Sequence, residues 1–217
     1  MGKDDQPKVL AAVGGKPILW HIMKYYSAFG FNDFVLCLGY KANFIYEYFK
    51  NNKEFNIEFI DTGVETNTGG RIKKIEKYIR EDSFFATYGD GLSDIDLRKL
   101  ESFHSGNKGI ATISVVKPRL QFGVVDFDGK SKSVKRFKEK PVLNYWINGG
   151  FFVFSRKVFE FLKESDILEK QSFVRLLKTK AVFAKKHSGF WVCMDTYKDN
   201  LVLNEIWAKG NAPWRIW

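Results

Sequence analysis

The stretch SFFATYGDG (residues 83–91) decides the fold expected for the chain around it. Its first six residues form the short apolar run that is typical of a strand buried on both faces of a sheet. Gly89-Asp90-Gly91 follows at once, and these glycines let the backbone turn sharply and leave room for a bulky ligand. Since ligands of open α/β sheets bind beyond the carboxyl ends of the strands, Asp90 is expected at a binding site. The alternative is an aspartate that only stabilises its own turn.

Helix and strand patterns alternate on both sides of this stretch. The expected helices before residue 110 are 17–29, 43–51, 70–79 and 94–104, and the expected strands are 33–39, 55–60 and 83–88. From residue 110 strands follow in close succession, and helices return at 156–163, 169–178 and 198–208. The pattern predicts one α/β domain over residues 1–217, with halves 1–108 and 109–217. We expect a mostly parallel sheet flanked by helices and a β-rich second half.

The composition excludes several classes of protein. The chain has 217 residues, of which 45% are hydrophobic and 21 are Phe, so it can bury one sizeable core and we expect a homo-oligomer. No apolar run approaches the roughly 20 residues of a membrane-spanning helix, so no membrane partner is expected. Cys37 and Cys193 lie in apolar runs without metal-ligand spacing, which predicts reduced thiols and a cytoplasmic protein.

The charge favours anionic partners without pointing to nucleic acid. The net charge is +10, which suits phosphorylated metabolites or nucleic acid. The basic residues are densest at 71–80 and 130–140, and charge runs of this kind are most often solvated faces. No recognition motif accompanies them, so nucleic acid is not an expected partner.

A second carboxylate follows another strand. Asp195 comes directly after the apolar run FWVCM. Two aspartates from separate strand ends hold Mg²⁺ together with phosphate oxygens and water, so Asp90 and Asp195 are the candidate metal ligands. The alternative for Asp195 is an N-cap of the helix that begins in TYKDNLVL.

Three further features suit anions and sugars, each with a plainer alternative. Lys140 in KEKP offers a point charge to a phosphate or lies on a solvated face. Asn148-Gly149-Gly150 opens a strand, where the amide serves sugar hydroxyl groups or only stabilises a bulge. The polar glycine loop 61–71 enters a helix whose first N–H groups suit an anion or the edge of a base, or form an ordinary helix cap.

Seven segments then occur together and in one order. They are GGKPILWHIMKYYSAFGFNDFVLCLGYK (14–41), DTGVETNTGGRIKKIEKYI (61–79), ATYGDGLSDID (86–96), FKEKP (137–141), WINGGFFVFS (146–155), GFWVCMDTYKDN (189–200) and APWRIW (212–217). Together they resemble the sugar-phosphate nucleotidyltransferases, and most closely the glucose-1-phosphate cytidylyltransferases. The resemblance covers nearly the whole chain, and TGGR, YGDG and WINGGFFV make it specific.

The resemblance implies a fold, a reaction and a cofactor. The fold is a Rossmann-like sheet with a nucleotide-binding half over 1–108 and a sugar-binding half with C-terminal helices over 109–217. The reaction converts CTP and glucose 1-phosphate to CDP-glucose and pyrophosphate, with Mg²⁺ as cofactor. The product feeds sugar synthesis for bacterial surface polysaccharide such as lipopolysaccharide O-antigen. Catalysis of this kind needs positioning and neutralisation of charge rather than a covalent intermediate.

The resemblance also assigns roles to individual residues. Asp90 and Asp195 match the metal aspartates, and Lys8 in QPKV matches a lysine that contacts the nucleotide phosphates. The residues matched to the nucleotide site are Glu65, Thr68, Gly70 and Gly89, together with Lys8. The residues matched to the sugar-phosphate site are Glu139, Lys140, Asn148 and Gly149.

One part of the family pattern has no match. The signature LAGGxGTRL, whose glycine backbone wraps the triphosphate, does not occur in the chain, and Gly14-Gly15 belongs to a later part of the pattern. Three explanations stay open: a truncated sequence, a non-catalytic binding or regulatory relative, and an enzyme whose phosphate clamp comes from another chain or loop. We expect CTP turnover to be greatly reduced or absent. The strand that precedes the signature is normally central, so we also expect the open sheet edge to be covered by Leu10–Val13 or by dimerisation.

Overall fold

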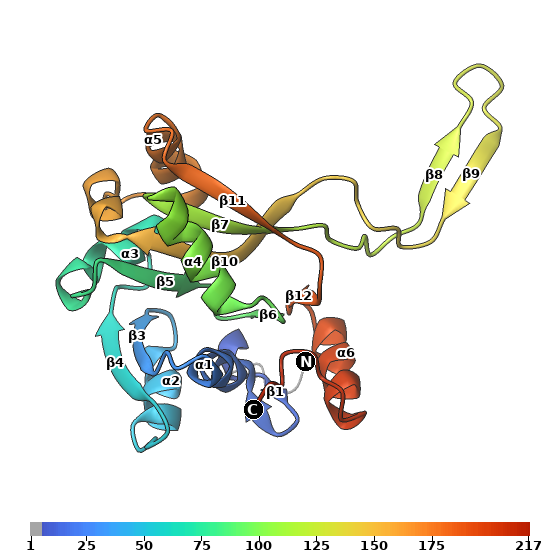
Figure 1. The fold of residues 1–217 in the computed structure, drawn as a ribbon. Helices are drawn as coiled ribbons and strands as arrows, with labels where there is room; N and C mark the ends of the chain where they lie inside the picture. The colour runs from blue at the N-terminus through green and yellow to red at the C-terminus, as the bar shows by residue number, and fades with distance from the viewer. Residues whose placement is uncertain (1–5) are drawn as a thin grey trace.

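The strand expected at 83–88 is β5 (Ser83–Thr87), and it forms one side of a four-stranded sheet. The computed structural model describes residues 6–217 and orders this sheet β11-β7-β10-β5 (Figure 1). The other three strands are β7 (Ala111–Val116), β10 (Ile147–Ser155) and β11 (Val182–His187). β10 runs antiparallel to both β5 and β7, whereas β11 is parallel to β7.

The remaining strands form two-stranded sheets. β3 (Asp33–Leu38) and β4 (Asn56–Asp61) are parallel. The antiparallel pairs are β1 (Ala12–Val13) with β2 (Lys16–Pro17), β6 (Gly91–Ser93) with β12 (Trp191–Cys193), and β8 (Val124–Phe127) with β9 (Val134–Lys138). The α/β class is as predicted, but the strand pairing is mixed rather than mostly parallel. The reason is that β7 reaches β10 through the β8–β9 hairpin and not through a crossover helix, so β7 and β10 are antiparallel.

β3 and β5 each have one edge without a strand partner. β3 pairs only with β4 and β5 pairs only with β10 in the described part of the chain. The expectation that Leu10–Val13 covers such an edge is wrong, because Ala12 and Val13 form β1 and pair with β2. All five residues of β5 are partly exposed to solvent, although the strand is largely apolar.

The helices lie close to their predicted ranges. They are α1 (Ile18–Ala28), α2 (Ala42–Phe49), α3 (Thr68–Lys74), α4 (Leu97–Asn107), α5 (Phe173–Leu177) and α6 (Tyr197–Ala208). Three-residue 3₁₀ turns occur at η1 (Lys8–Leu10) and η2 (Glu76–Tyr78). Two predicted helices have other geometries: 156–163 is the 3₁₀ helix η3 (Arg156–Phe161), and 169–178 begins with the π-helical turn η4 (Leu168–Ser172) before α5.

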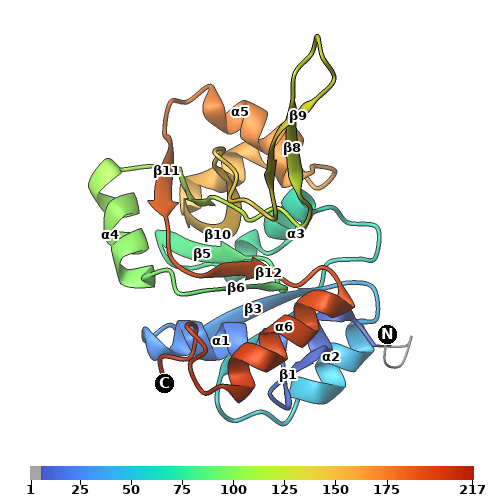
Figure 2. The same ribbon diagram turned by 90° about the vertical axis from the view of Figure 1, so that its right-hand side faces the viewer.

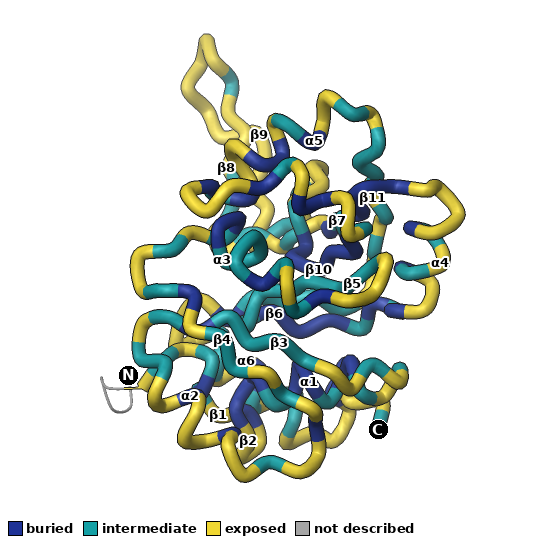
Figure 3. The backbone as a smooth tube through the Cα atoms, turned by 90° about the vertical axis from the view of Figure 1, so that its left-hand side faces the viewer, coloured by how far each residue is buried: buried dark blue, intermediate teal, exposed yellow. Residues whose placement is uncertain are grey.

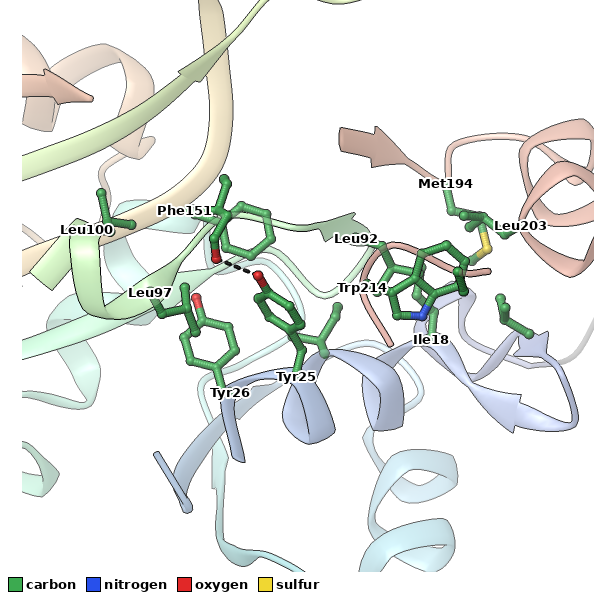
Figure 4. Close-up of a cluster of buried hydrophobic side chains, with 14 of the residues drawn as sticks. Ile18, Tyr25, Tyr26, Leu92, Leu97, Leu100, Phe151, Met194, Leu203 and Trp214 are labelled. Carbon is green, nitrogen blue, oxygen red and sulfur yellow. Dashed lines mark hydrogen bonds between the residues drawn. The ribbon is translucent and has the colours of Figure 1, made fainter. Parts of the chain in front are cut away.

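The core has two main clusters on opposite faces of β10. Successive side chains of a strand point to opposite faces, so Phe151 and Val153 pack on one side and Phe152 and Phe154 on the other. The first cluster joins α1 to the C-terminal Trp214, and the Tyr25 hydroxyl there donates to the Ile95 carbonyl (Figure 4). Burial differs sharply between strands: β10 is mostly buried, whereas the β8–β9 hairpin is mostly exposed (Figure 3).

Two expectations from composition concern membranes and thiols. Within residues 6–217, no helix combines the length and the apolar character that crossing a bilayer takes. Cys37 and Cys193 are free thiols, as predicted.

Candidate active site

Asp90 and Asp195, the predicted metal ligands, lie next to each other. Asp90 joins β5 to β6, and Asp195 follows β12. In the β6–β12 ladder Gly91 stands opposite Cys193, and the Met194 N–H donates to the Asp90 carbonyl at 2.8 Å. One carboxylate oxygen of each aspartate and the Cys193 sulfur therefore lie within 4.8 Å of one another.

The carboxylate of Asp195 is not used as a helix cap. Thr196 is the N-cap of α6, where its hydroxyl accepts a hydrogen bond from the Asp199 N–H at 3.2 Å. The Asp199 carboxylate in turn accepts from the Thr196 N–H at 2.7 Å, which completes a capping box. The side chain of Asp195 is left to face Asp90.

Lys8 bridges the two aspartates. Its Nζ lies 2.7 Å from Asp90 Oδ2 and 2.7 Å from Asp195 Oδ1. Burial opposes the charged form of Lys8, but hydrogen bonds to Asp195 and Asp90 outweigh it and raise the lysine pKa. The Lys8 hydrogen bond lowers the pKa of Asp195. Burial, with the two carboxylate charges, raises the pKa of Cys193 to about 12, so this group stays a thiol at neutral pH.

Gly89 lets the segment that carries Lys8 approach the site. A Cβ at residue 89 would lie 2.8 Å from Val9 Cγ1, which is closer than side chains tolerate. The next residue, Leu10, is buried against Leu19 and Met23 of α1. The glycine before Asp90 and the apolar anchor after Lys8 together hold the ammonium group against the carboxylates.

A cavity of about 220 Å³ adjoins this cluster. Its lining includes the predicted Asp90, Asp195, Asn148 and Gly149. The sequence assigned no role to Tyr88 and Trp191, which also line it, although both occur in the segments ATYGDG and GFWVCMD. Only their position could have indicated that they line the site, since each lies within a few residues of a candidate aspartate.

Asn148 occupies a bulge, and the bulge shapes the cavity wall. The pairing of β10 with β7 shifts register between Asn148 and Phe152, and Gly150 has a φ of 75°. The Asn148 Oδ1 accepts from the Gly150 N–H at 2.9 Å, and the Gly149 carbonyl accepts from the Trp191 indole N–H at 2.7 Å. The two alternatives for Asn148 are thus compatible, because an amide that stabilises the bulge also lines the cavity.

The residues predicted to surround the base do not line this cavity. Thr68 is the first residue of α3. Its hydroxyl donates to Glu169 Oε2 at 3.2 Å and accepts from the Leu168 N–H at 3.0 Å. A Cβ on Gly70 would lie 2.0 Å from the Glu164 carbonyl oxygen, so this glycine permits close backbone packing. Glu65 lies in the same loop, between β4 and α3.

Glu139 and Lys140 lie neither in the cavity beside Asp90 nor in the loop before α3. They directly follow β9, at the base of the β8–β9 hairpin that projects from the body of the molecule (Figure 2). The Lys140 Nζ lies 3.6 Å from Glu139 Oε1, and the Arg119 guanidinium donates to the Lys140 carbonyl at 3.4 Å. Neither residue lines the cavity beside Asp90.

The chain matches known proteins over nearly its whole length. Residues 3–192 match the family model described as nucleotidyl transferase. The chain is 40% identical to the probable glucose-1-phosphate cytidylyltransferase of Bacillus subtilis, with 99% of this chain and 93% of that protein covered. It is 36% identical to the glucose-1-phosphate cytidylyltransferase of Salmonella typhimurium, with 98% and 92% covered.

Solved structures share the fold. The structure of HddC from Yersinia pseudotuberculosis in complex with GMP-PN superposes with a TM-score of 0.72 at 25% identity, covering 94% of this chain and 92% of that one. The inositol-1-phosphate CTP transferase from T. maritima superposes with a TM-score of 0.71 at 20% identity, covering 96% and 89%. From its sequence match and its fold, the chain belongs to the nucleotidyl transferase family.

Proposed function

We propose that this chain is a glucose-1-phosphate cytidylyltransferase, which forms CDP-glucose and pyrophosphate from CTP and glucose 1-phosphate, with the low turnover expected of a chain in which the LAGGxGTRL signature has no match. The observation that carries the proposal is the pair Asp90–Asp195, bridged by Lys8 beside a cavity that Asn148 and Gly149 line. The identity of 36–40% to cytidylyltransferases over nearly the whole chain supports the choice of CTP and glucose. The product would serve surface polysaccharide synthesis from the cytoplasm.

The donor set at the site fits Mg²⁺. Asp90 and Asp195 offer hard carboxylate oxygens, which Mg²⁺ prefers, so these two residues would hold the ion. Cys193, the third group of the cluster, stays a thiol because of its raised pKa and is a poor ligand for a hard cation. When bound, the ion would neutralise charge on the reacting phosphates.

The protein's own residues would position the substrates. A phosphate oxygen of glucose 1-phosphate attacks the α-phosphorus of CTP, the bond from that phosphorus to the β-phosphate oxygen breaks, and pyrophosphate leaves with the electron pair. Lys8 would hold a phosphate, since its ammonium is the cation nearest the carboxylates. Asn148 and Gly149 would contact the sugar. Glu139 and Lys140 remain the proposed sugar-phosphate pair. The residues proposed to bind the nucleotide remain Glu65, Thr68, Gly70 and Gly89.

A second candidate is a module that binds sugar phosphate without turnover. The size of the cavity favours it, because 220 Å³ is below the roughly 300–1,000 Å³ of typical ligand pockets and holds a sugar more easily than a nucleoside triphosphate.

Titration calorimetry with CTP, glucose 1-phosphate and duplex DNA, each with and without Mg²⁺, separates these functions. The enzyme requires Mg²⁺-dependent CTP binding and formation of CDP-glucose, which chromatography of the reaction mixture detects. Binding of glucose 1-phosphate alone, without product, supports the binding module. Steeply salt-dependent DNA binding contradicts both.

A further inference from the structure

A second cavity lies at the opposite end of β5 and β10 from the candidate active site. It is lined by the start of β5, the end of β10 and the turn after α4. β5 begins at this cavity with Ser83 and leads toward Asp90 (Figure 1). β10 runs the other way, from Asn148 back to Ser155. The two cavities share no lining residue, so the second one is a separate place on the molecule.

The second cavity has the size and the mixed lining of a small-molecule site. Its volume is about 590 Å³, within the roughly 300–1,000 Å³ of typical ligand pockets. Such pockets combine apolar walls with a small number of placed polar groups. Ile110, Phe161 and Ala181 supply the apolar part here. The polar part decides which ligand fits.

His104 is a buried polar residue in the wall of the second cavity. It lies on α4, is 4% exposed and belongs to the lining. Its Nδ1 lies 2.9 Å from the Thr112 hydroxyl oxygen, and its Nε2 has no hydrogen-bond partner within residues 6–217. Burial lowers the pKa of His104, so the neutral ring offers Nε2 as a donor or an acceptor according to its tautomer. Because buried polar groups are normally hydrogen-bonded, this nitrogen is a contact point for a ligand.

Two lysines place positive charge at the second cavity. Lys108 follows α4 and Lys157 lies in η3, and both belong to the lining. Neither ammonium group has an ion pair or a hydrogen bond within the described part of the chain. Asp82 is the one carboxylate among the lining residues that the structure describes, so the local charge is net positive. Cations gathered at a cavity favour an anion, and an ammonium group serves a phosphate as a point charge.

Hydroxyl groups complete the polar lining. They belong to Ser83, Ser105, Ser155 and Thr179. The Thr179 hydroxyl bonds within its own turn, whereas the three serine hydroxyls have no partner among residues 6–217. Serine hydroxyls donate and accept, and a carboxylate such as Asp82 accepts, so together they suit the hydroxyl groups of a sugar.

We propose that the second cavity binds a phosphorylated sugar, with its phosphate on Lys108 and Lys157 and its hydroxyl groups on the serines and His104. This chemistry has two sources, a free sugar phosphate and a nucleotide whose base lies on the Phe161 ring. The proposal needs no reaction at Asp90, so it stands or falls independently of the proposed function.

An NMR titration with ribose 5-phosphate locates the ligand residue by residue. The amide signals of Lys108, Gly109 and Lys157 are expected to shift in isotope-labelled protein and to reach saturation at millimolar ligand. The signals of Asp90 and Asn148 report on the candidate active site in the same titration. If the first three signals do not move at millimolar ribose 5-phosphate, the second cavity is an unliganded surface groove and the proposal is wrong.

Charge reversal tests the two lysines. In Lys108→Glu/Lys157→Glu the dissociation constant at the second cavity should rise at least about tenfold, because hydrogen bonds to charged groups are the strong ones. The matched control is Lys53→Glu/Lys209→Glu, which changes the net charge equally at two exposed lysines that line neither cavity. Its binding should stay close to the wild-type value. Unchanged binding in the first variant, or an equal loss in the control, would contradict the proposal.

Two further ligands identify the source and test the role of the hydroxyl groups. Inorganic phosphate should shift the same amides but bind more weakly than ribose 5-phosphate, because it makes no sugar contacts. CMP contains the same sugar phosphate, so tighter binding of CMP identifies a nucleotide that stacks on Phe161, and equal binding identifies a free sugar phosphate. Both results support the proposal. Inorganic phosphate that binds as tightly as ribose 5-phosphate and CMP would show that the serines and His104 take no part, and the sugar site would be refuted.

Discussion

Lys8 takes a position between Asp90 and Asp195 that a divalent cation would also favour. Two ionised carboxylates within 4.8 Å repel each other, and one ammonium neutralises only half of their charge. The remaining negative charge favours a second cation. The proposed Mg²⁺ and a substrate phosphate would both suit this charge, since Lys8 could turn from a carboxylate to a phosphate oxygen.

Asp90→Asn and Asp195→Asn are therefore expected to weaken Mg²⁺-dependent CTP binding. Each change removes one charged oxygen ligand, so the dissociation constant should rise roughly tenfold or more, about 1.4 kcal/mol. Calorimetric titration in Mg²⁺ measures it. Glu101→Gln on α4 removes a partly exposed carboxylate that pairs with Arg98, and binding should stay at the wild-type value. Equal binding in all three variants would rule out the metal site.

His21 predicts a pH dependence of stability. Its Nε2 contacts the Val13 carbonyl at 2.7 Å and its Nδ1 accepts from the Trp214 indole, so the neutral ring satisfies both. Burial lowers the His21 pKa below 6.5, so the unfolded chain binds more protons just below that pH and stability falls as pH falls from 7 to 5. His21→Phe should lower the free energy of unfolding by about 1–3 kcal/mol for each hydrogen-bond partner left unpaired. It should also make stability depend less steeply on pH, and the part of the pH dependence that remains would come from buried His104, whose pKa is also lowered. Urea unfolding at pH 5, 6 and 7 measures both, and an unchanged slope would contradict the assignment.

The sequence predicted the two residues of the candidate site that follow strands, but it missed the residues whose place depends on tertiary contact. Asp90 and Asp195 could be found because an aspartate after a buried strand lies at the edge where ligands bind. Tyr88 and Trp191 could not be separated from core aromatics by pattern. The sequence also did not show that Thr196, rather than Asp195, caps α6, because the two residues are adjacent and both residue types are common N-caps.

At the scale of elements, α3 begins in tight contact with the loop before η4. The Gly70 N–H donates to the Asp166 carbonyl at 3.1 Å, and the Glu164 carbonyl lies where a Cβ would be. Gly70→Ala should therefore lower the free energy of unfolding by about 1–3 kcal/mol through overpacking. Gly106→Ala in α4, where a Cβ meets nothing, should instead stabilise by about 0.5–1 kcal/mol. Chemical denaturation compares them, and a Gly70 variant as stable as the wild type would argue for a ligand-binding role alone.

Element positions were predictable where the signal was local, and pairings were not. The amphipathic spacing of α1 and the apolar run of β3 each specify an element within about ten residues. The antiparallel pairing of β10 with β5 joins residues more than sixty positions apart, and the sequence of neither strand indicates which strand it pairs with. The expectation of a mostly parallel sheet failed for this reason.

At the scale of the whole molecule, two blocks meet without a shared strand ladder. β3 with β4 forms one block and β11-β7-β10-β5 the other. Side chains bridge them instead: Phe34 and Phe85 both pack on the first core cluster, and Val35 and Phe84 on the second. Packing between the blocks thus replaces the hydrogen bonds that join neighbouring strands elsewhere.

Amide hydrogen exchange should reveal this division. The β3 amides that do not bond to β4, and the β5 amides that do not bond to β10, face edges without strand partners, so they should exchange through local openings. The amides of Phe152 and Val153 lie in β10, which has a strand on each side, and should exchange only by global unfolding. Residue-resolved exchange by NMR would show the contrast as a difference of orders of magnitude in protection. Uniform protection across β3, β5 and β10 would contradict this division and would mean that in solution another segment or a second copy covers the open edges of β3 and β5.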